Sequence, residues 1–233
     1  MGKLESELQK AIANSNEPRT SREADIELLS SHGMTTLKSL YRAVNDSELE
    51  VNLRQAACWA LSQVGGSQSV SVLTRALNDR DSHVSLEAAK SLIALNRKES
   101  IPKLQRALSE GANPHNRSAA AYALGFMGDR KAVPNLIKTL QGDENAEVRS
   151  HAAEALGHLA DKRALRRLIA HLTDDSAEVR FWSAFALGEI GDPGARAALE
   201  RVASTDRANL PKRGPVSREA RNAIKRIKER SGQ

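Results

Sequence analysis

Small and apolar residues recur at helical spacing in a segment that repeats along the chain. The clearest copies read LRQAACWALSQVGG, NRSAAAYALGFMGD, VRSHAAEALGHLAD and VRFWSAFALGEIGD. Counted from the second residue of each copy, small or apolar residues occupy offsets +3, +4, +6 and +7. This spacing places them on one face of an α-helix. Because many of them are alanine, we expect neighbouring helices to approach closely.

The copies follow one another at a period of about 31 residues. Their reference residues are Arg54, Ser85, Arg117, Arg149 and Arg180, at spacings of 31, 32, 32 and 31. A weaker copy has its reference residue at Arg22, and another at Ser217 after an interval of 37 residues. Terminal copies of stacked repeats are usually atypical because they cover the ends of the core. The sequence therefore predicts about seven units.

Each unit is predicted to contain two helices. Offset +11 holds residues that suit the left-handed end of a helix, namely Gly33, Gly65, Asn96, Gly128, Ala160 and Gly191. Pro102, Pro134 and Pro193 then stand where a second helix would begin. The second helix carries an apolar stripe and ends in an acidic turn such as NDRD, QGDE or TDDS. No β pattern competes, so we predict an all-α fold, a right-handed α-solenoid of about seven helical hairpins.

The same pattern divides the chain into four parts. We predict an N-terminal helical extension at residues 1–20 and a solenoid at 21–203. Residues 204–216 are interpreted as a Pro/Gly linker or insertion, and residues 217–233 as a basic capping helix.

Composition and charge add little to the prediction of the fold but limit the class of protein and its cellular location. The chain has 40% hydrophobic, 27% charged and only 3% aromatic residues, and a single cysteine, Cys58. One cysteine excludes an internal disulfide framework, and no apolar run approaches a membrane span, so we predict a cytoplasmic protein. Of the net charge of +6, the segment 201–233 holds ten Lys/Arg against three Asp/Glu. The basic character therefore belongs to the tail.

Scarce aromatic residues gather at positions that helix packing does not require. With +3, +4, +7 and +11 directed into the stack, offsets +1, +2, +5 and +9 of the first helix should point outward, and we call the surface that they form the groove. Six of the seven aromatic residues fall at these offsets. The predicted groove residues, including polar neighbours, are Trp59, Gln63, Lys90, Tyr122, Phe126, His151, Glu154, His158, Phe181, Trp182, Phe185 and Glu189.

Two interpretations of these rings stay open. One is that they fold back onto neighbouring helices and fill space, which we consider above all for Phe126 and Phe181. The other is a contact surface, which we favour for the remaining four rings of the groove. Tyr and Trp dominate binding hot spots, and a contiguous apolar strip usually has a ligand.

The polar groove residues His151, Glu154 and His158 lie on one helical face, because their spacing is i, i+3 and i+7. A metal site is one interpretation and a solvated part of the groove is the other. We favour the second, since adjacent repeats offer no further cluster of histidines or carboxylates, and we predict no metal.

Four arginines recur at the start of the first helices: Arg54, Arg117, Arg149 and Arg180. Most follow an acidic turn by about six residues, as in the pairs Asp143 with Arg149 and Asp174 with Arg180. Phosphate binding is one interpretation. We favour an Asp–Arg ladder that ties successive turns together and satisfies open N–H groups at the helix N-termini.

The charge of the groove argues against nucleic acid there. In the five central repeats its positions carry one base, Lys90, and three acids, Glu87, Glu154 and Glu189. That is the wrong sign for a polyanion. Basic residues cluster instead at 162–167 and in the tail, where an acidic partner or RNA stays an alternative.

The pattern EVRxxAAxALGxxGDxxAVPxLxxxL resembles HEAT repeats, specifically the short kind named after phycobilisome lyases. The resemblance covers residues 22–228, with the best match in units four to six, and the third unit lacks both the arginine and the Gly-Asp pair. It implies an α-solenoid whose first helices line the concave side. HEAT-like deoxyhypusine hydroxylases bind iron through adjacent His-Glu dyads, whereas none of the six histidines here is followed by Glu.

The sequence shows no nucleophile–base pair and no phosphate loop, so we predict a non-enzymatic scaffold without a cofactor. Its groove would bind a protein partner or peptide segment, with a second solenoid subunit as a further candidate partner. The family resemblance implies an alternative, a phycobilin lyase or chromophore-handling protein that holds a linear tetrapyrrole. In that case Glu154, His151 and His158 would handle its protons. Nucleic-acid binding through the tail and the outer helices is a third alternative.

Overall fold

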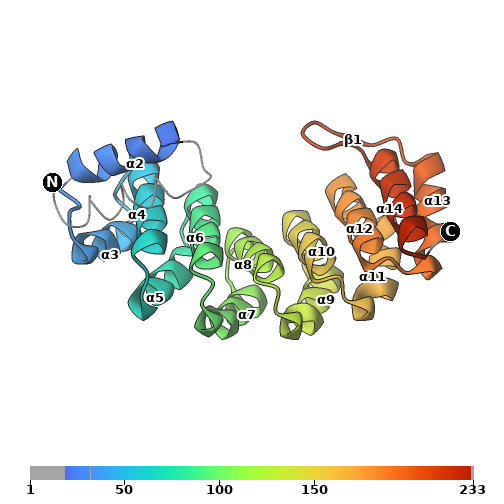
Figure 1. The fold of residues 1–233 in the computed structure, drawn as a ribbon, viewed down its shortest axis with the longest axis horizontal. Helices are drawn as coiled ribbons and strands as arrows, with labels where there is room; N and C mark the ends of the chain where they lie inside the picture. The colour runs from blue at the N-terminus through green and yellow to red at the C-terminus, as the bar shows by residue number, and fades with distance from the viewer. Residues whose placement is uncertain (1–18, 32, 232–233) are drawn as a thin grey trace. The chain divides into compact units, whose positions relative to one another are not determined.

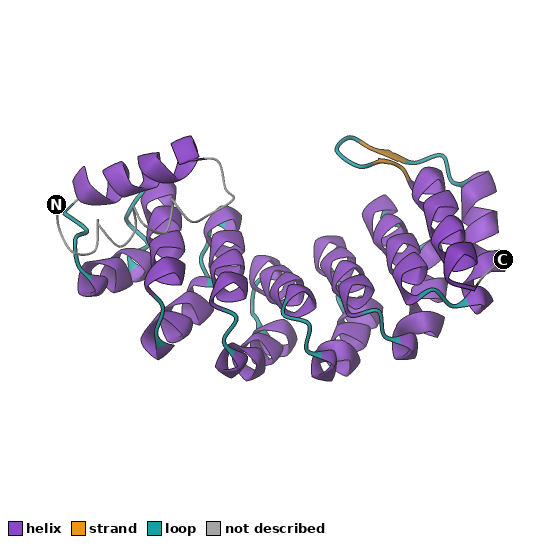
Figure 2. Cartoon of the chain, viewed as in Figure 1, coloured by secondary structure: helices purple, strands orange, loops and turns teal. Residues whose placement is uncertain are grey.

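The computed structural model describes residues 19–31 and 33–231, which are mostly helical (Figures 1 and 2). Nearly all of the predicted extension at residues 1–20 lies outside this range. The first helices of the repeats are α2 (Arg19–Ser31), α4 (Val51–Val64), α6 (Ser82–Leu95), α8 (Pro114–Phe126), α10 (Ala146–Leu159), α12 (Ala177–Ile190) and α14 (Val216–Ser231). The second helices are α3 (Leu37–Asn45), α5 (Ser67–Ala76), α7 (Ile101–Glu110), α9 (Val133–Gly142), α11 (Leu165–Ala170) and α13 (Arg196–Thr205).

Every predicted reference residue, from Arg22 to Ser217, lies in a first helix, so the repeat is confirmed in the described residues. Four second helices begin with one 3₁₀ turn, and a fifth 3₁₀ turn follows α11. These turns are η1 (Lys98–Ser100), η2 (Arg130–Ala132), η3 (Lys162–Ala164), η4 (His171–Thr173) and η5 (Pro193–Ala195). Pro102 and Pro134 are the second residues of α7 and α9, and Pro193 opens η5, as predicted.

The chain forms two compact units, residues 1–104 and 105–233, each with its own helix packing. In the N-terminal unit α4 packs against α2, α3, α5 and α6. In the C-terminal unit α10 packs against α8, α9 and α12, and α14 packs against α12 and α13 (Figure 1). First helices therefore stack directly on first helices within the C-terminal unit.

Close approach between these first helices depends on glycine at offset +8. A Cβ added at Gly125 would lie 2.6 Å from the Cα of Ala155, and one at Gly157 would lie 3.0 Å from the Cα of Ala186. Any side chain at these positions would push the neighbouring helix away. The repeated ALG sequence of the first helices is thus a packing requirement.

The first helices end where the sequence predicts. All six residues at offset +11 have positive φ: Gly33 (68°), Gly65 (79°), Asn96 (45°), Gly128 (73°), Ala160 (47°) and Gly191 (71°). Glycine and asparagine adopt this conformation at low cost, whereas alanine does not. Ala160 is therefore a strained position in an otherwise regular series.

The segment predicted as a linker or insertion contains regular structure. Helix α13 continues to Thr205, and β1 (Asn209–Leu210) then pairs antiparallel with β2 (Gly214–Pro215) before α14 begins (orange in Figure 2). Strands of two residues are too short to produce an alternating pattern of polar and apolar positions. The sequence therefore could not reveal this hairpin.

The core consists mainly of buried alanine, leucine and valine side chains, as the low aromatic content predicts. Cys58 lies within it, where burial raises the pKa of the thiol, with smaller contributions from Glu87 and Asp79. None of the described helices combines the length and the apolar character that a membrane span requires.

Candidate functional site

Each of the four predicted arginines joins two successive turns of the repeat. Its guanidinium forms two N–H···O bonds to one aspartate 25 or 26 residues later, in the pairs Arg54–Asp79, Arg117–Asp143, Arg149–Asp174 and Arg180–Asp206. The remaining Nη1 donates to backbone carbonyls of the preceding turn. Arg149, for example, donates to the carbonyls of Asp143 and Glu144, at 3.0 Å each.

These pairs differ from the predicted pairing in one respect. The sequence associated Asp143 with Arg149, but the Asp143 carboxylate binds Arg117 of the preceding repeat, at 2.6 and 2.9 Å. The only group of Asp143 to which Arg149 donates is the backbone carbonyl. In the same way, Asp174 pairs with Arg149 and not with Arg180. The ladder also contains Asp79 and Asp206, which the sequence analysis did not single out.

The ladder aspartates do not cap the first helices either. Their carboxylates accept an N–H two residues ahead, as Asp143 does from Asn145 at 3.0 Å. The Asn145 side chain accepts hydrogen bonds from the open N–H groups at the start of α10, and the Asp81 side chain does so for α6. In α6 and α10 the side chain two residues after the ladder aspartate therefore performs the capping, whereas Ser176, at the same place before α12, makes no such bond.

The ladder holds its aspartates in the charged form. Burial by itself would raise the pKa values of Asp143, Asp174 and Asp206, but hydrogen bonds from the arginines and from backbone N–H groups outweigh burial and lower them. The bond to Asp143 correspondingly raises the pKa of Arg117. We conclude that the recurring arginines are already occupied and offer no phosphate site.

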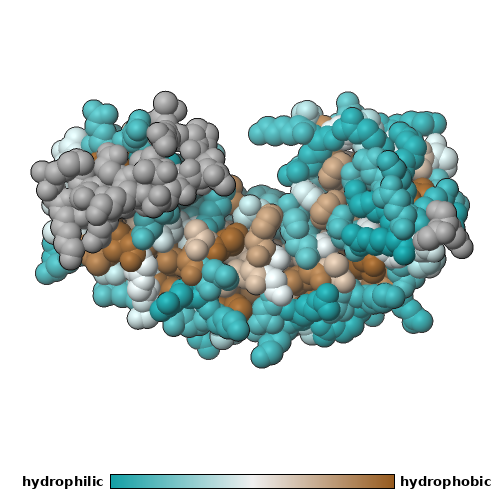
Figure 3. All heavy atoms as spheres, in the orientation of Figure 1, coloured by the Kyte–Doolittle hydropathy of each residue, from teal (hydrophilic) through white to brown (hydrophobic). Residues whose placement is uncertain are grey.

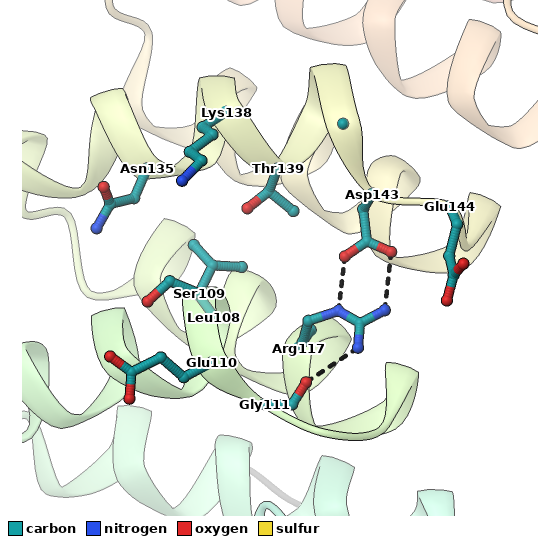
Figure 4. Close-up of a pocket in the computed structure, with 11 residues that line it drawn as sticks. Leu108, Ser109, Glu110, Gly111, Arg117, Asn135, Lys138, Thr139, Asp143 and Glu144 are labelled. Atoms are coloured by element: carbon teal, nitrogen blue, oxygen red, sulfur yellow. Dashed lines mark hydrogen bonds and ion pairs between the residues drawn. The ribbon is translucent and has the colours of Figure 1, made fainter.

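A polar cleft of about 500 Å³ lies beside one rung of the ladder, between the end of α7 and α9 (Figure 4). Ser109 and Glu110 line it from α7, and Asn135, Lys138 and Thr139 from α9. Its wall includes the Arg117–Asp143 pair, and Arg117 Nη1 also donates to the carbonyl of Gly111. The cleft contains none of the predicted groove residues.

Exposure of the predicted groove residues depends on their offset. Residues at +9 are the most accessible: Gln63, Phe126 and His158 are exposed, and Glu189 is half-buried. At +5, Lys90 is exposed and Tyr122 and Phe185 are half-buried. Positions +1 and +2 are mostly covered because they meet across neighbouring first helices. Ser118 Oγ at +1 of α8, for example, lies 2.7 Å from His151 Nδ1 at +2 of α10.

Two rings that were expected in an exposed groove, Trp59 and Trp182, are buried, and so is Phe181, for which a packing role was also considered. Trp59, Phe181 and Trp182 are only 5%, 9% and 8% exposed. The guanidinium of Arg22, from α2, lies over Trp59 with 5.1 Å between Cζ and the ring centroid. Arg213, from the β-hairpin, lies over Trp182 at 4.4 Å. Phe126 shows the reverse, since the ring for which we considered a packing role is 45% exposed.

The rings of the C-terminal unit form a connected series across α8, α10 and α12. Tyr122 contacts Phe126, Phe126 contacts His158, and His158 contacts Phe185, with centroid distances of 4.7, 4.2 and 5.8 Å. Phe185 continues to Trp182, which reaches Phe181, and Tyr122 also contacts His151. We call the accessible rings of this series, Tyr122, Phe126, His158 and Phe185, together with the buried carboxylate of Glu154, the ring face.

One carboxylate lies among these rings. Glu154 is 8% exposed, and among the described residues the side chain that approaches its carboxylate is the His158 ring, with Nε2 3.9 Å from Oε1. Tyr122 and Glu154 stand at the same offset, +5, in the packed helices α8 and α10, and burial raises the pKa of Tyr122 with a smaller contribution from Glu154. The described residues contain no group of three or more His, Cys, Asp or Glu side chains suited to a metal ion.

Two arginines that contact rings of the predicted groove escaped the sequence analysis, Arg226 because the groove positions were assigned only in the five central repeats, and Arg213 because it lies outside the repeat helices. Arg226 stands at offset +9 of the last copy, the offset of Phe126, His158 and Glu189 in earlier copies. In the structure its guanidinium lies over Phe185 at 5.5 Å and pairs with Glu189 and Glu219. Extending the offset rule to the last copy would have found this arginine. No periodic signal marks Arg213.

Basic residues of the C-terminal unit lie mainly on its second helices and on α14. Arg130, Lys131, Lys162, Arg166 and Arg167 are exposed there. Figure 3 shows mostly hydrophilic side chains over α9, α11 and α13. These cations therefore lie apart from the ring face, as predicted.

The sequence profile of HEAT repeats matches residues 5–92, 75–141 and 133–213. The chain is a HEAT-repeat protein. Its fold class, an all-α solenoid, is the one that the resemblance implied. No curated protein sequence matches this HEAT-repeat protein.

Three solved structures illustrate the likeness. The complex of CpcE and CpcF of phycocyanin lyase from Nostoc sp. PCC7120 is 19% identical, covers 68% of this chain and 99% of that chain, and has a TM-score of 0.59. YibA of Escherichia coli is 19% identical, with 97% and 82% covered and a TM-score of 0.58. An engineered protein is 21% identical, with 83% and 98% covered and a TM-score of 0.51. At such identities the likeness concerns the fold alone.

Proposed function

We propose that this HEAT-repeat protein is a binding scaffold whose ring face holds a segment of a protein partner. The observation that carries the proposal is the exposure of Phe126, 45%, at the centre of a connected series of rings. The packing of the repeat does not require these rings, because the same offsets hold Trp59, Lys90 and Glu154 (+5) or Gln63, Ala94 and Glu189 (+9) in other copies.

The mechanism of binding follows from the neighbours of Phe126. Tyr122 and His158 contact its ring and fix its orientation, so little side-chain entropy is lost when a partner covers it. An accessible aromatic anchor that is held rigidly by its neighbours is typical of binding hot spots. Repeats that stack first helix on first helix present such anchors as one extended surface.

A random peptide library displayed on phage tests this proposal. We expect the wild-type protein to enrich a family of related sequences and the Tyr122→Ala/Phe126→Ala double variant to lose them. The control is Leu37→Ala, which removes another exposed apolar side chain, 38% accessible, from α3 in the N-terminal unit. Circular dichroism confirms that each variant keeps its helices. The proposal is wrong if no family is enriched, or if the double variant enriches the same sequences as the wild type.

A linear tetrapyrrole is a second candidate ligand for the ring face. A flat conjugated molecule would stack on the accessible rings of Phe126 and His158. The solved structure of a phycocyanin lyase complex, similar in fold, makes this class of ligand worth testing. Titration with a bilin should sharpen and red-shift its absorption band if the pigment binds. An unchanged spectrum would remove this candidate and leave the protein segment.

A further inference from the structure

An arginine of the N-terminal unit lies between an aromatic ring and a buried carboxylate. Arg22 Cζ is 5.1 Å from the centroid of Trp59, and its Nη2 is 3.2 Å from Oε1 of Glu87. Glu87 is only 7% exposed. A second cation, Lys90, approaches the same carboxylate at 3.8 Å. The buried charge of Glu87 is thereby compensated within the unit.

The C-terminal unit repeats this arrangement with other residues. Arg226 Cζ lies 5.5 Å from the centroid of Phe185, and its Nε is 3.3 Å from Oε1 of Glu189. Its Nη2 also pairs with Glu219, which is 9% exposed. Both arginines thus combine an ion pair with a cation–π contact on the first-helix side of the repeats.

Glu154 has the same surroundings but a weaker partner. It is as buried as Glu87, it shares offset +5 with Tyr122 of the adjacent helix α8, and it lies one turn before His158, whose ring contacts Phe126. Among the described residues, neither a lysine nor an arginine comes within 4.0 Å of its carboxylate, and His158 Nε2 is 3.9 Å away. A buried carboxylate is costly unless a cation compensates it.

We propose that Glu154 receives an arginine side chain of the bound partner segment, in the way that Glu87 receives Arg22. This inference rests on the proposed function and names the chemistry that the ring face selects. The guanidinium would pair with the Glu154 carboxylate while its plane lies on the ring of Tyr122 or Phe126. Arginine fits better than lysine because its planar fork donates two parallel bonds to a carboxylate and stacks on rings.

A short peptide tests the proposal without knowledge of the natural partner. Acetyl-Leu-Arg-Leu-amide is titrated into the isotope-labelled full chain while the ring resonances of Tyr122 and His158 are followed by NMR. The matched probe replaces arginine with citrulline, which keeps the shape and removes the charge. We expect saturable shifts with the arginine peptide and at least about tenfold weaker binding of the citrulline peptide.

Two variants make the test specific for the carboxylate. Glu154→Gln should weaken binding of the arginine peptide at least about tenfold, because it removes the charge and keeps the volume. Glu144→Gln, an exposed carboxylate on the turn before α10, should leave binding unchanged. Equal binding of both peptides, no saturable shift, or full binding to Glu154→Gln would overturn the proposal.

The peptide library separates this inference from the proposed function. If the wild type enriches sequences that contain no invariant arginine, and the ring-face variant loses them, the scaffold proposal stands and the arginine proposal fails. If the enriched sequences share an arginine that Glu154→Gln no longer selects, both stand. If no sequence is enriched, the scaffold proposal fails, and the arginine peptide alone decides whether Glu154 accepts a guanidinium.

Discussion

Single residues at one offset end the first helices of this protein, and their conformation was predictable from residue type. Glycine or asparagine holds five of the six positions, and all six have positive φ. Ala160, at φ 47° and ψ 45°, occupies the left-handed region with a Cβ but, unlike Asn96, without a polar side chain that can form a local hydrogen bond. The regular spacing of the repeat, and not the preference of the residue, keeps alanine in that conformation.

Replacement of Ala160 by glycine should therefore stabilise the protein. We expect Ala160→Gly to raise the free energy of unfolding by about 0.5–1 kcal/mol, since relief of left-handed strain exceeds the added entropy of the unfolded chain. Gly128→Ala should lower it by about 1 kcal/mol, because a Cβ there meets no atom within 4 Å and only the backbone is strained. Denaturant unfolding monitored by circular dichroism measures both changes. A loss of stability in Ala160→Gly would contradict this account.

The exposure of single rings was less predictable than their offset. The offset rule identified the side of the helix correctly for Tyr122, Phe126 and Phe185. It could not foresee that Arg22 and Arg213 cover Trp59 and Trp182. Those arginines come from α2 and from the β-hairpin, whose positions depend on tertiary packing.

At the scale of elements, successive repeats are joined by two features that recur at fixed offsets, the Asp–Arg ladder and the glycine at +8. Both were visible in the sequence as repeated letters. The pairing within the ladder was not visible in the sequence, because an aspartate that lies between two ladder arginines along the chain could pair with either of them. The third copy illustrates the rule, since Ser85 replaces the arginine and Gly111 stands at the ladder position of the next turn. Both members of that rung are absent together.

Loss of one ladder carboxylate charge should lower the stability of the C-terminal unit. We expect Asp174→Asn to lower the free energy of unfolding by about 2 kcal/mol at pH 7, because the partly buried Arg149 guanidinium loses its charged partner. Asp175→Asn changes an exposed neighbour and serves as the control. Chemical denaturation compares them, and equal stabilities would show that the ladder contributes nothing.

The ladder should also make stability depend on acid pH. The pKa values of Asp143, Asp174 and Asp206 are lower in the folded protein than the ordinary carboxyl value. Their contribution is therefore fully present above about pH 4 and is lost as the pH falls through the lowered values. Denaturation curves of the wild type should show this loss below pH 4, and Asp174→Asn should reduce its slope. A slope that is the same in both proteins would contradict the assignment.

Close helix approach gives a separate prediction at the same scale. Gly157→Ala should lower the free energy of unfolding by about 1–3 kcal/mol, since the new Cβ would lie 2.8 Å from the Phe185 ring and 3.0 Å from the Cα of Ala186. Gly142→Ala, at the end of α9, is the matched control because a Cβ there meets nothing within 4 Å. If the two variants unfold at the same denaturant concentration, glycine at +8 is not needed for packing.

For the whole molecule, the period of the sequence was sufficient to predict the fold class and the number of repeats. Each repeat contacts mainly its neighbours, so local spacing already determines most of the packing. The function is harder to predict from the period, because the ring face occupies positions at which the repeat does not require a particular residue type. The proposed function assigns binding specificity to those positions, in particular Phe126 and Glu154.

The central claim is that the ring face binds a protein segment, and the affinity of one selected peptide for a single-site variant tests it most directly. Isothermal titration calorimetry compares the wild type with Phe126→Ala, and with Leu37→Ala as the control. We predict that Phe126→Ala weakens binding at least about thirtyfold, equivalent to about 2 kcal/mol, while Leu37→Ala leaves the affinity unchanged. An affinity of Phe126→Ala equal to that of the wild type would show that the segment binds elsewhere.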